Sequence, residues 1–191
     1  MVSEINKSKS SFVHPLKFAL WIGIGSIVMM FISLTSAYIV RQAAGNWLEF
    51  KLPSVFMLST CAILLSSITL QMASSAFRKG NESTYKLMLL STLALGMIFI
   101  LFQYQGWLQM RASGIELSGN PSGSFVYVLS GLHAAHVIGG IGILFLACYH
   151  AFVLPFVQSE RRLLRLDLTS QYWHFVDVLW VFLFIFFMVQ R

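Results

Sequence analysis

The chain has 191 residues, of which 57% are hydrophobic and only 10% are charged. Soluble domains carry about 25% charged residues, so this composition excludes an ordinary soluble enzyme or binding domain. A formal net charge of +6 would suit a nucleic-acid partner in a soluble protein. Here the placement of Lys and Arg between long apolar stretches explains the charge better, so we expect no nucleic-acid partner.

Five apolar stretches predict an all-α integral membrane protein with five transmembrane helices. A helix crosses the hydrocarbon core with about 20 apolar residues. In lipid the backbone must satisfy its own hydrogen bonds, which favours helices. We expect a polar tail over residues 1–15 and one five-helix bundle over residues 16–191, with helices at about 18–40, 53–77, 87–110, 125–154 and 171–190.

Two of the expected connections are long. Residues 111–124 have the sequence RASGIELSGNPSGS, which is rich in turn-forming residues and predicts an irregular loop. Residues 158–169 have the sequence QSERRLLRLDLT. We expect this segment to be a charged loop whose leucines lie on the membrane surface.

Basic residues concentrate on one side of the expected bundle. Nine Lys and Arg residues fall in the N-terminal tail and the second and fourth loops, against four in the other loops and at the C-terminus. Cytoplasmic loops carry an excess of Lys and Arg. The distribution therefore predicts a cytoplasmic N-terminus and a C-terminus outside the cell.

Small side chains recur along several expected helices, and in lipid such residues let helices approach closely. In the fourth helix Gly131, Ala135 and Gly139 occur every four residues. The first helix contains Gly23 and Gly25, and the second carries a series of serines and alanines. We interpret these series as helix-packing surfaces.

Histidines in the last two helices raise the possibility of haem. His136 and His150 lie on nearly one face of the fourth helix, about 21 Å apart. This spacing is typical of one half of the ligand ladder in transmembrane b-type cytochromes. The fifth helix offers only His174, which we expect at the depth of His150, so His136 has no partner. A self-contained b-type haem protein with these three ligands stays an alternative with an incomplete ligand set.

No other site chemistry is indicated. Cys61 and Cys148 fall inside apolar stretches, so no disulfide framework is expected. His133 and His136 share a helix face, but no third metal ligand is visible near them. We therefore expect no catalytic residue, no metal site and no cofactor in this chain.

One acidic residue lies inside the last apolar stretch. Trp173, Asp177 and Trp180 share one helix face, and His174 is one turn from Asp177. An ionised carboxylate at the membrane centre costs about 2.5 kcal/mol or more, so Asp177 should face protein or water and be paired or protonated. Two interpretations stay open: a structural pair with His174, or a cytoplasmic-side site that collects protons or docks a partner.

Motifs in the second half of the chain resemble those of one family. The last helix contains QYWHFVDVLWVFLF, and the helix before it contains GSFVYVLSGLHAAHVIGG with a Gly-Leu-His-x-x-His-Val pattern. Upstream lie FQYQGWLQM and GNPSGS. These motifs are similar to those of subunit III of the haem-copper terminal oxidases, the cytochrome c oxidase subunit III family. The resemblance extends over essentially the whole chain from Phe18.

The resemblance implies the short bacterial form of the family, which has five helices and lies in the bacterial inner membrane. It implies an accessory subunit of a proton-pumping oxidase that reduces O2 to water, with haems and copper in subunits I and II. Subunit III packs on subunit I, binds phospholipid in a cleft between two helix groups and supports proton uptake. The matching positions, with packing, lipid or proton-uptake roles, are His133, His136, Trp173, His174, Asp177 and Trp180.

One position departs from the family pattern. The family usually has a buried glutamate in the first of these five helices, within a Ser-Glu-Val-Met-like stretch. Here the matching text is SIVMMF, with Ile27 at the acidic position. The sequence leaves open a quinol oxidase subunit, a structural scaffold of another respiratory assembly, and membership of a larger supercomplex.

Overall fold

The structure is a computed structural model that describes residues 14–190, and it contains five long helices. Each is long and apolar enough to cross a membrane, and the described residues contain no strand. The all-α membrane fold is therefore confirmed. The expected tail lies outside the described residues except for positions 14 and 15. The helices are α1 (Pro15–Ala43), α2 (Val55–Arg78), α3 (Glu82–Ala112), α4 (Pro121–Val153) and α5 (Glu160–Val189).

The largest difference from the expected boundaries is at the start of α5. The charged segment 158–169, expected as a surface loop, supplies its first turns instead. Ser159 caps this helix by accepting a hydrogen bond from the backbone N–H of Arg162 at 3.3 Å. Leu166 is buried in the bundle. The loop prediction was wrong because charge places a segment outside the hydrocarbon without preventing it from being helical.

Helix α4 also begins earlier than expected. Asn120 accepts a hydrogen bond from the backbone N–H of Ser122 at 3.0 Å, and Pro121 occupies the first helical turn. Proline is favoured there because its missing N–H would have no helical partner. The irregular loop therefore ends at Asn120, not at residue 124.

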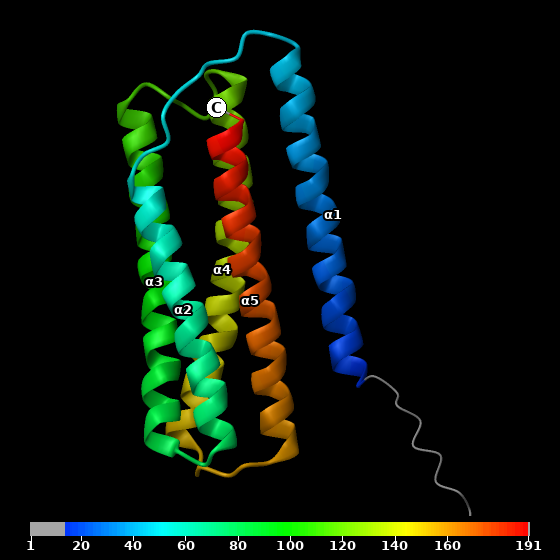
Figure 1. Cartoon of the computed structure of the whole chain (residues 1–191), viewed down its shortest axis with the longest axis vertical. Helices are drawn as coiled ribbons and strands as arrows, with labels where there is room; N and C mark the ends of the chain where they lie inside the picture. Colours follow the sequence, from blue (N-terminus) through cyan, green and yellow to red (C-terminus); the bar gives the residue numbers. More distant parts are fainter. Residues whose placement is uncertain (1–13, 191) are drawn as a thin grey trace, which may run out of the picture.

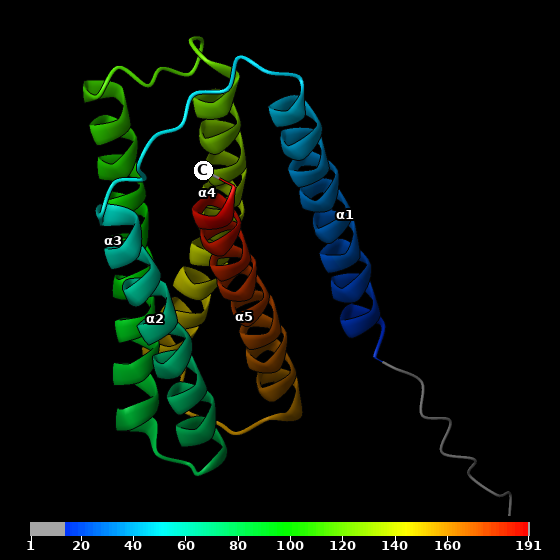
Figure 2. The ribbon, with the colours of Figure 1, turned by 45° about the horizontal axis from the view of Figure 1, so that its top comes forward.

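Helices α2 to α5 form a closed four-helix bundle. Each helix of this bundle contacts two others, in the cyclic order α2, α3, α4, α5. Helix α1 contacts only α4 and α5 and stands to one side. Its C-terminal half approaches the bundle, while its N-terminal half diverges from it (Figures 1 and 2).

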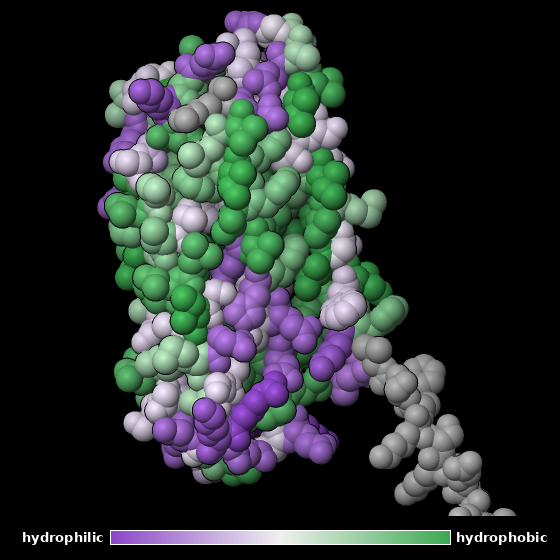
Figure 3. All heavy atoms as spheres, in the orientation of Figure 1, coloured by the Kyte–Doolittle hydropathy of each residue, from purple (hydrophilic) through white to green (hydrophobic). Residues whose placement is uncertain are grey.

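One end of the molecule is strongly basic. The α2–α3 turn and the α4–α5 connection meet there, and the surface of this end is mostly hydrophilic, below a largely hydrophobic middle (Figure 3). We call it the basic end; its basic residues are Arg78, Lys79, Lys86, Arg161, Arg162 and Arg165.

Aromatic contacts hold the C-terminal half of α1 against the bundle. The Tyr38 ring lies 4.6 Å from Trp47 and 5.0 Å from Phe186, measured between ring centroids. Its hydroxyl donates a hydrogen bond to the carbonyl of Gln190 at 3.3 Å. These contacts hold the C-terminal end of α1 closer to the bundle than its other end, which one side-chain hydrogen bond still joins to α5.

Close helix contacts at glycines lie beside the Gly131, Ala135 and Gly139 series and not at its members. A Cβ at Gly96 of α3 would lie 2.8 Å from the Trp173 ring, and one at Gly140 of α4 would lie 3.0 Å from it. A Cβ at Gly131 would meet nothing within 4 Å, and Ala135 is exposed. Within this chain, Gly131 and Ala135 therefore do not form a helix-packing surface.

The same holds for Gly23 and Gly25 of α1, where an added Cβ meets nothing within 4 Å. In contrast, many small residues of α2 are buried in the bundle and do form a packing surface. The buried ones are Ser59, Ala62, Ser66, Ala73, Ser74 and Ala76.

We predict that Gly96→Ala destabilises the bundle, because its methyl group would overlap the fully buried Trp173 ring. The expected loss is about 1–3 kcal/mol of unfolding free energy. Gly131→Ala is the matched control, with the same change at an open helical position. Thermal unfolding in detergent measures both, and equal midpoints for the two variants would contradict the packing assignment.

Candidate functional site

Two tryptophans of α5 enter the bundle and bond to α2. Trp173 is fully buried, and its Nε1–H donates to Ser66 Oγ at 2.9 Å. Trp180 is 1% exposed, and its Nε1–H donates to Thr60 Oγ1 at 2.9 Å. A buried indole N–H usually requires a partner, and α2 supplies one at each level. These bonds fix the position of α5 along α2.

His133 of α4 belongs to an aromatic cluster beside Trp180. The two ring centroids are 5.1 Å apart, and Phe99 of α3 meets the His133 ring edge-on at 5.8 Å. His133 is fully buried, and neither ring nitrogen has a hydrogen-bond partner among the described residues. Its surroundings are those of a packed ring.

Asp177 lies on the same inner face of α5 and is 2% exposed. Neither of its oxygens has a well-aligned hydrogen bond to a described residue, and its polar neighbour is the hydroxyl of Ser67. His174 is directed to α2 instead, where its Nδ1 lies 2.5 Å from Ser67 Oγ. The structural pair expected between His174 and Asp177 is therefore not formed. The i, i+3 spacing indicated that the two residues are adjacent, but the side chain of His174 bonds to a neighbouring helix.

Sequence reasoning missed the polar residues of α2 and α3 that complete this layer. Gln103 of α3 is fully buried, and its Nε2 donates to Ser59 Oγ at 3.0 Å. Thr69 and Thr92 bond through their hydroxyls at 2.8 Å. The serine series of α2 was visible in the sequence, and the need of two buried indoles for acceptors could have identified its role.

A polar groove opens beside this layer, between α2 and α5. Its walls are formed by the polar residues Ser67, Gln71, Ser75 and His174 and by the apolar residues Ile68 and Met72. On this face hydrophilic residues extend from the basic end into the hydrophobic middle of the molecule (Figure 3). Polar side chains exposed to hydrocarbon are costly. This groove therefore suits contact with another protein or with water better than contact with lipid.

The histidines of the haem alternative face three different neighbours. His136 lies against Phe31 of α1, with ring centroids 5.9 Å apart, and its Nδ1 is 2.7 Å from the carbonyl of Leu132. His174 is directed to α2, and His150 lines a cavity at the basic end.

The expected depth of His174 was also wrong. Tyr172 donates a hydrogen bond to the carbonyl of His136 at 3.0 Å, so this part of α5 lies near the level of His136 and away from His150. Among residues 14–190, no group of three His, Cys, Asp or Glu side chains is placed to hold a metal ion.

Ile27 of α1, at the position where the family has an acid, is partly buried and packs against the hydrophobic core. It lies one helical turn from Phe31, the residue that contacts His136. The acidic position is therefore occupied by an apolar packing residue.

We predict that Asp177→Asn changes the unfolding free energy by less than about 1 kcal/mol, because the carboxyl group has no charged partner to lose. Breaking a buried ion pair would cost about 3–5 kcal/mol. Thermal unfolding of the purified protein tests this, with Trp173→Phe as a variant expected to destabilise. A large loss for Asp177→Asn would show that an ion pair exists.

Comparison with known proteins agrees with the motifs. The family model described as cytochrome c oxidase subunit III matches residues 5–190. The chain is 30% identical over 186 residues to a probable cytochrome c oxidase subunit 3 of Nocardia farcinica, covering 90% of this chain and 89% of that protein. It is 29% identical over 174 residues to a probable quinol oxidase subunit 3 of Staphylococcus saprophyticus, covering 88% and 85%.

A probable quinol oxidase subunit 3 of Staphylococcus aureus is likewise 29% identical over 180 residues. The match of the family model extends over nearly the entire sequence and all five helices. The chain is a multi-pass membrane protein that belongs to the cytochrome c oxidase subunit III family.

Proposed function

We propose that this chain is the accessory subunit III of a proton-pumping haem-copper oxidase that reduces O2 to water. Its family membership supports this assignment. In this proposal the haems and copper reside in partner subunits, subunit I and subunit II, and the chain itself carries no redox centre. Its role is to pack on subunit I, to stabilise it and to support its proton uptake, with phospholipid bound at the helix surfaces.

Two electron donors of the oxidase, cytochrome c and quinol, are compatible with this role. Relatives of similar identity are named as subunits of cytochrome c oxidases and of quinol oxidases. We favour a cytochrome c oxidase, in keeping with the name of the family model, and keep the quinol oxidase as the alternative.

The polar groove is the observation that carries the docking part of this proposal. It places Gln71, Ser75 and His174 on an otherwise apolar face, and His174 is about one helical turn from the buried Asp177. In a membrane such a face is best covered by polar groups of another subunit or by water held between subunits. We therefore assign this face to the contact with subunit I. We further propose that Asp177 and His174 support proton uptake from the middle of the bundle, near the level of His136.

The distribution of charge supports the matching orientation. The basic end, together with the N-terminal tail, carries most of the Lys and Arg residues, and such excess marks the cytoplasmic side. In this orientation the groove opens towards the side from which protons are taken up.

We predict that a mild-detergent pull-down of the tagged chain from its native membrane retains a many-helix partner that contains haem and copper. A reduced-minus-oxidised spectrum and mass identification of the partners measure this outcome. A b-type haem spectrum from this chain alone, with haem in stoichiometric amount, would contradict the proposal. It would instead support a self-contained haem protein with His136 and His150 as ligands.

We predict that a photo-crosslinking residue at Gln71 captures the large partner in the assembled complex. Leu90 of α3 is the matched control, because it is exposed at a similar distance from the α2–α3 turn but lies on another face. Gel analysis after irradiation compares the two variants. Capture from position 90 and not from position 71 would place the interface elsewhere.

If Asp177 supports proton uptake, Asp177→Asn should slow turnover of the assembled oxidase most at high pH, where bulk protons are scarce. The pH–rate profile of the purified complex measures the effect, with unchanged subunit content as the condition. Cys148→Ser, a buried substitution in α4 away from the groove, is the control. Coincident profiles for wild type and Asp177→Asn would remove Asp177 from the pathway.

A further inference from the structure

Polar residues on one face of α2 extend from the basic end to the middle of the bundle. They are Ser67, Gln71, Ser75 and Arg78, which follow one another at intervals of three or four residues and so share this face. From Arg78 to Ser67 the helix rises about 16 Å, roughly half of the hydrocarbon thickness of a membrane. We call this face the polar track. All but Arg78 line the polar groove, and on this side of the molecule hydrophilic surface extends from the basic end into the hydrophobic middle (Figure 3).

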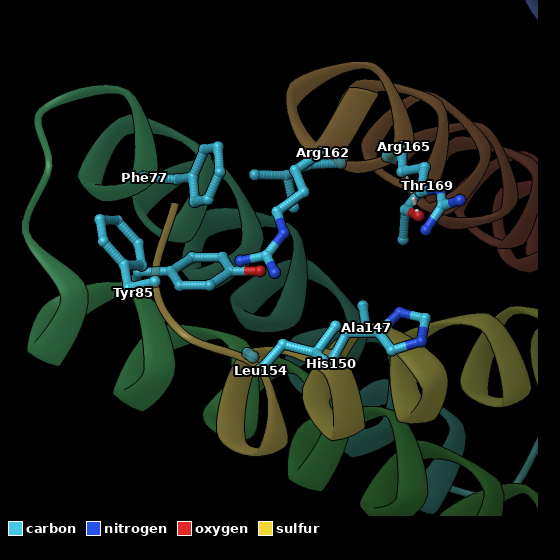
Figure 4. Close-up of a pocket in the computed structure, with 11 residues that line it drawn as sticks. Phe77, Tyr85, Ala147, His150, Leu154, Arg162, Arg165 and Thr169 are labelled. Atoms are coloured by element: carbon cyan, nitrogen blue, oxygen red, sulfur yellow. Dashed lines mark hydrogen bonds between the residues drawn. The ribbon is translucent and has the colours of Figure 1, made fainter. Parts of the chain in front are cut away.

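The polar track begins at an ion pair between α2 and α5. Arg78 Nη2 lies 2.8 Å from Asp167 Oδ1, and both side chains are accessible to water. The track is separate from the cavity at the basic end, which is lined by residues that include His150, Arg162 and Arg165 (Figure 4). This cavity and the polar groove share no lining residue. The track therefore joins the basic end to the groove along α2 alone.

The polar track ends at a hydroxyl that has two titratable neighbours. Ser67 Oγ lies 2.5 Å from His174 Nδ1, and it is also the polar neighbour of the buried Asp177. His174 lines the groove, and its other ring nitrogen, Nε2, makes no hydrogen bond to a described residue. The groove is therefore connected to the Asp177 carboxyl group through the imidazole of His174 and the hydroxyl of Ser67.

No basic side chain compensates a negative charge on Asp177. In the described parts of α1 to α4, every Lys, Arg, Asp and Glu lies within two turns of a helix end, whereas Asp177 is in the middle of the bundle. Helix α4 adds two histidines: His133 packs against Trp180, and His136 is directed to Phe31 of α1. An ionised carboxylate buried without a partner is costly, which favours the neutral carboxylic acid.

We propose that Asp177 stores a proton and exchanges it with water at the basic end, through Ser67, His174 and the polar track. This inference rests on the proposed role of Asp177 in proton uptake. It adds the path that an acid in the middle of the membrane requires, and it assigns Ser67 as the residue that positions the proton between the two titratable groups.

The loading step moves one proton and changes no oxidation state. A proton from water in the groove binds Nε2 of neutral His174, and the Nδ1–H proton passes to Ser67 Oγ. The hydroxyl proton of Ser67 passes at the same time to a carboxylate oxygen of Asp177. His174 and Ser67 end neutral, as they began, and rotation of the hydroxyl about its C–O bond allows the same path to unload the proton.

Infrared spectroscopy of the purified chain in liposomes tests the stored proton. A protonated carboxyl group has a C=O band that shifts when deuterium replaces the proton. Asp177 is the only buried Asp or Glu among residues 14–190, so the band that Asp177→Asn removes can be assigned to it. We expect wild type to show this band at neutral pH and to shift it after transfer to D2O.

Two substitutions at Ser67 of equal shape test the path. Ser67→Val lacks a hydroxyl and should keep the band but slow its exchange about 100-fold, the effect of one positioned proton-transfer group. Ser67→Thr keeps a hydroxyl and should exchange at the wild-type rate. Gln71→Leu, an apolar group midway along the polar track, should also slow exchange. Ser74→Ala is the control, because it removes a buried hydroxyl of α2 that has no hydrogen-bond partner and does not line the groove.

Two results would overturn the proposal. If Asp177→Asn removes no carboxyl band, Asp177 does not hold a proton. If Ser67→Val and Ser67→Thr exchange at equal rates, the proton does not pass through the Ser67 hydroxyl.

Turnover of the assembled oxidase is a separate measurement. Slow exchange in Ser67→Val with unchanged oxidase turnover would uphold the path to Asp177 and contradict its role in proton uptake. Wild-type exchange in Ser67→Val, together with slowed turnover in Asp177→Asn, would overturn the path and leave the proposed uptake role in place.

Discussion

The two indole–hydroxyl bonds between α5 and α2 are the constraint on which the rest of the bundle depends. The indole rings of Trp173 and Trp180 are apolar except for one N–H group each. Each N–H donates a hydrogen bond to a hydroxyl oxygen on α2. Because both bonds must form at once, α5 can occupy only one register along α2. That register also brings Trp173 against the glycines of α3 and α4, and so closes the four-helix ring.

The same register decides which polar groups stay inside and which reach the surface. Asp177 is buried on the same face of α5 as the two tryptophans, whereas His174 is directed to Ser67 and lines the polar groove. Exposure of such a groove to lipid would be energetically costly, whereas a subunit interface can supply polar partners for its side chains. The chain thus has one face suited to a protein partner, while α1 and the outer faces of α3 and α4 present mainly apolar side chains.

The basic end has a different character from the groove. Most of its cations are there because of membrane topology, and two ion pairs neutralise Arg78 and Lys86. Arg162 and Arg165 differ from them because they line a half-open cavity that contains no Asp or Glu.

The sequence by itself determined the five helices, their membrane character and the inward face of α5, because apolar length and helical spacing are local properties. The predicted start of α5 was eleven residues too far along the chain, because charged residues mark the end of the apolar stretch and not the end of the helix. Only the tertiary structure decided that Gly96 and Gly140, not Gly131, receive a neighbour, and that His174 bonds to Ser67 instead of Asp177. The physical reason is that these contacts join residues from different helices. The spacing of residues along one helix does not determine how neighbouring helices are rotated or how deep they lie relative to one another.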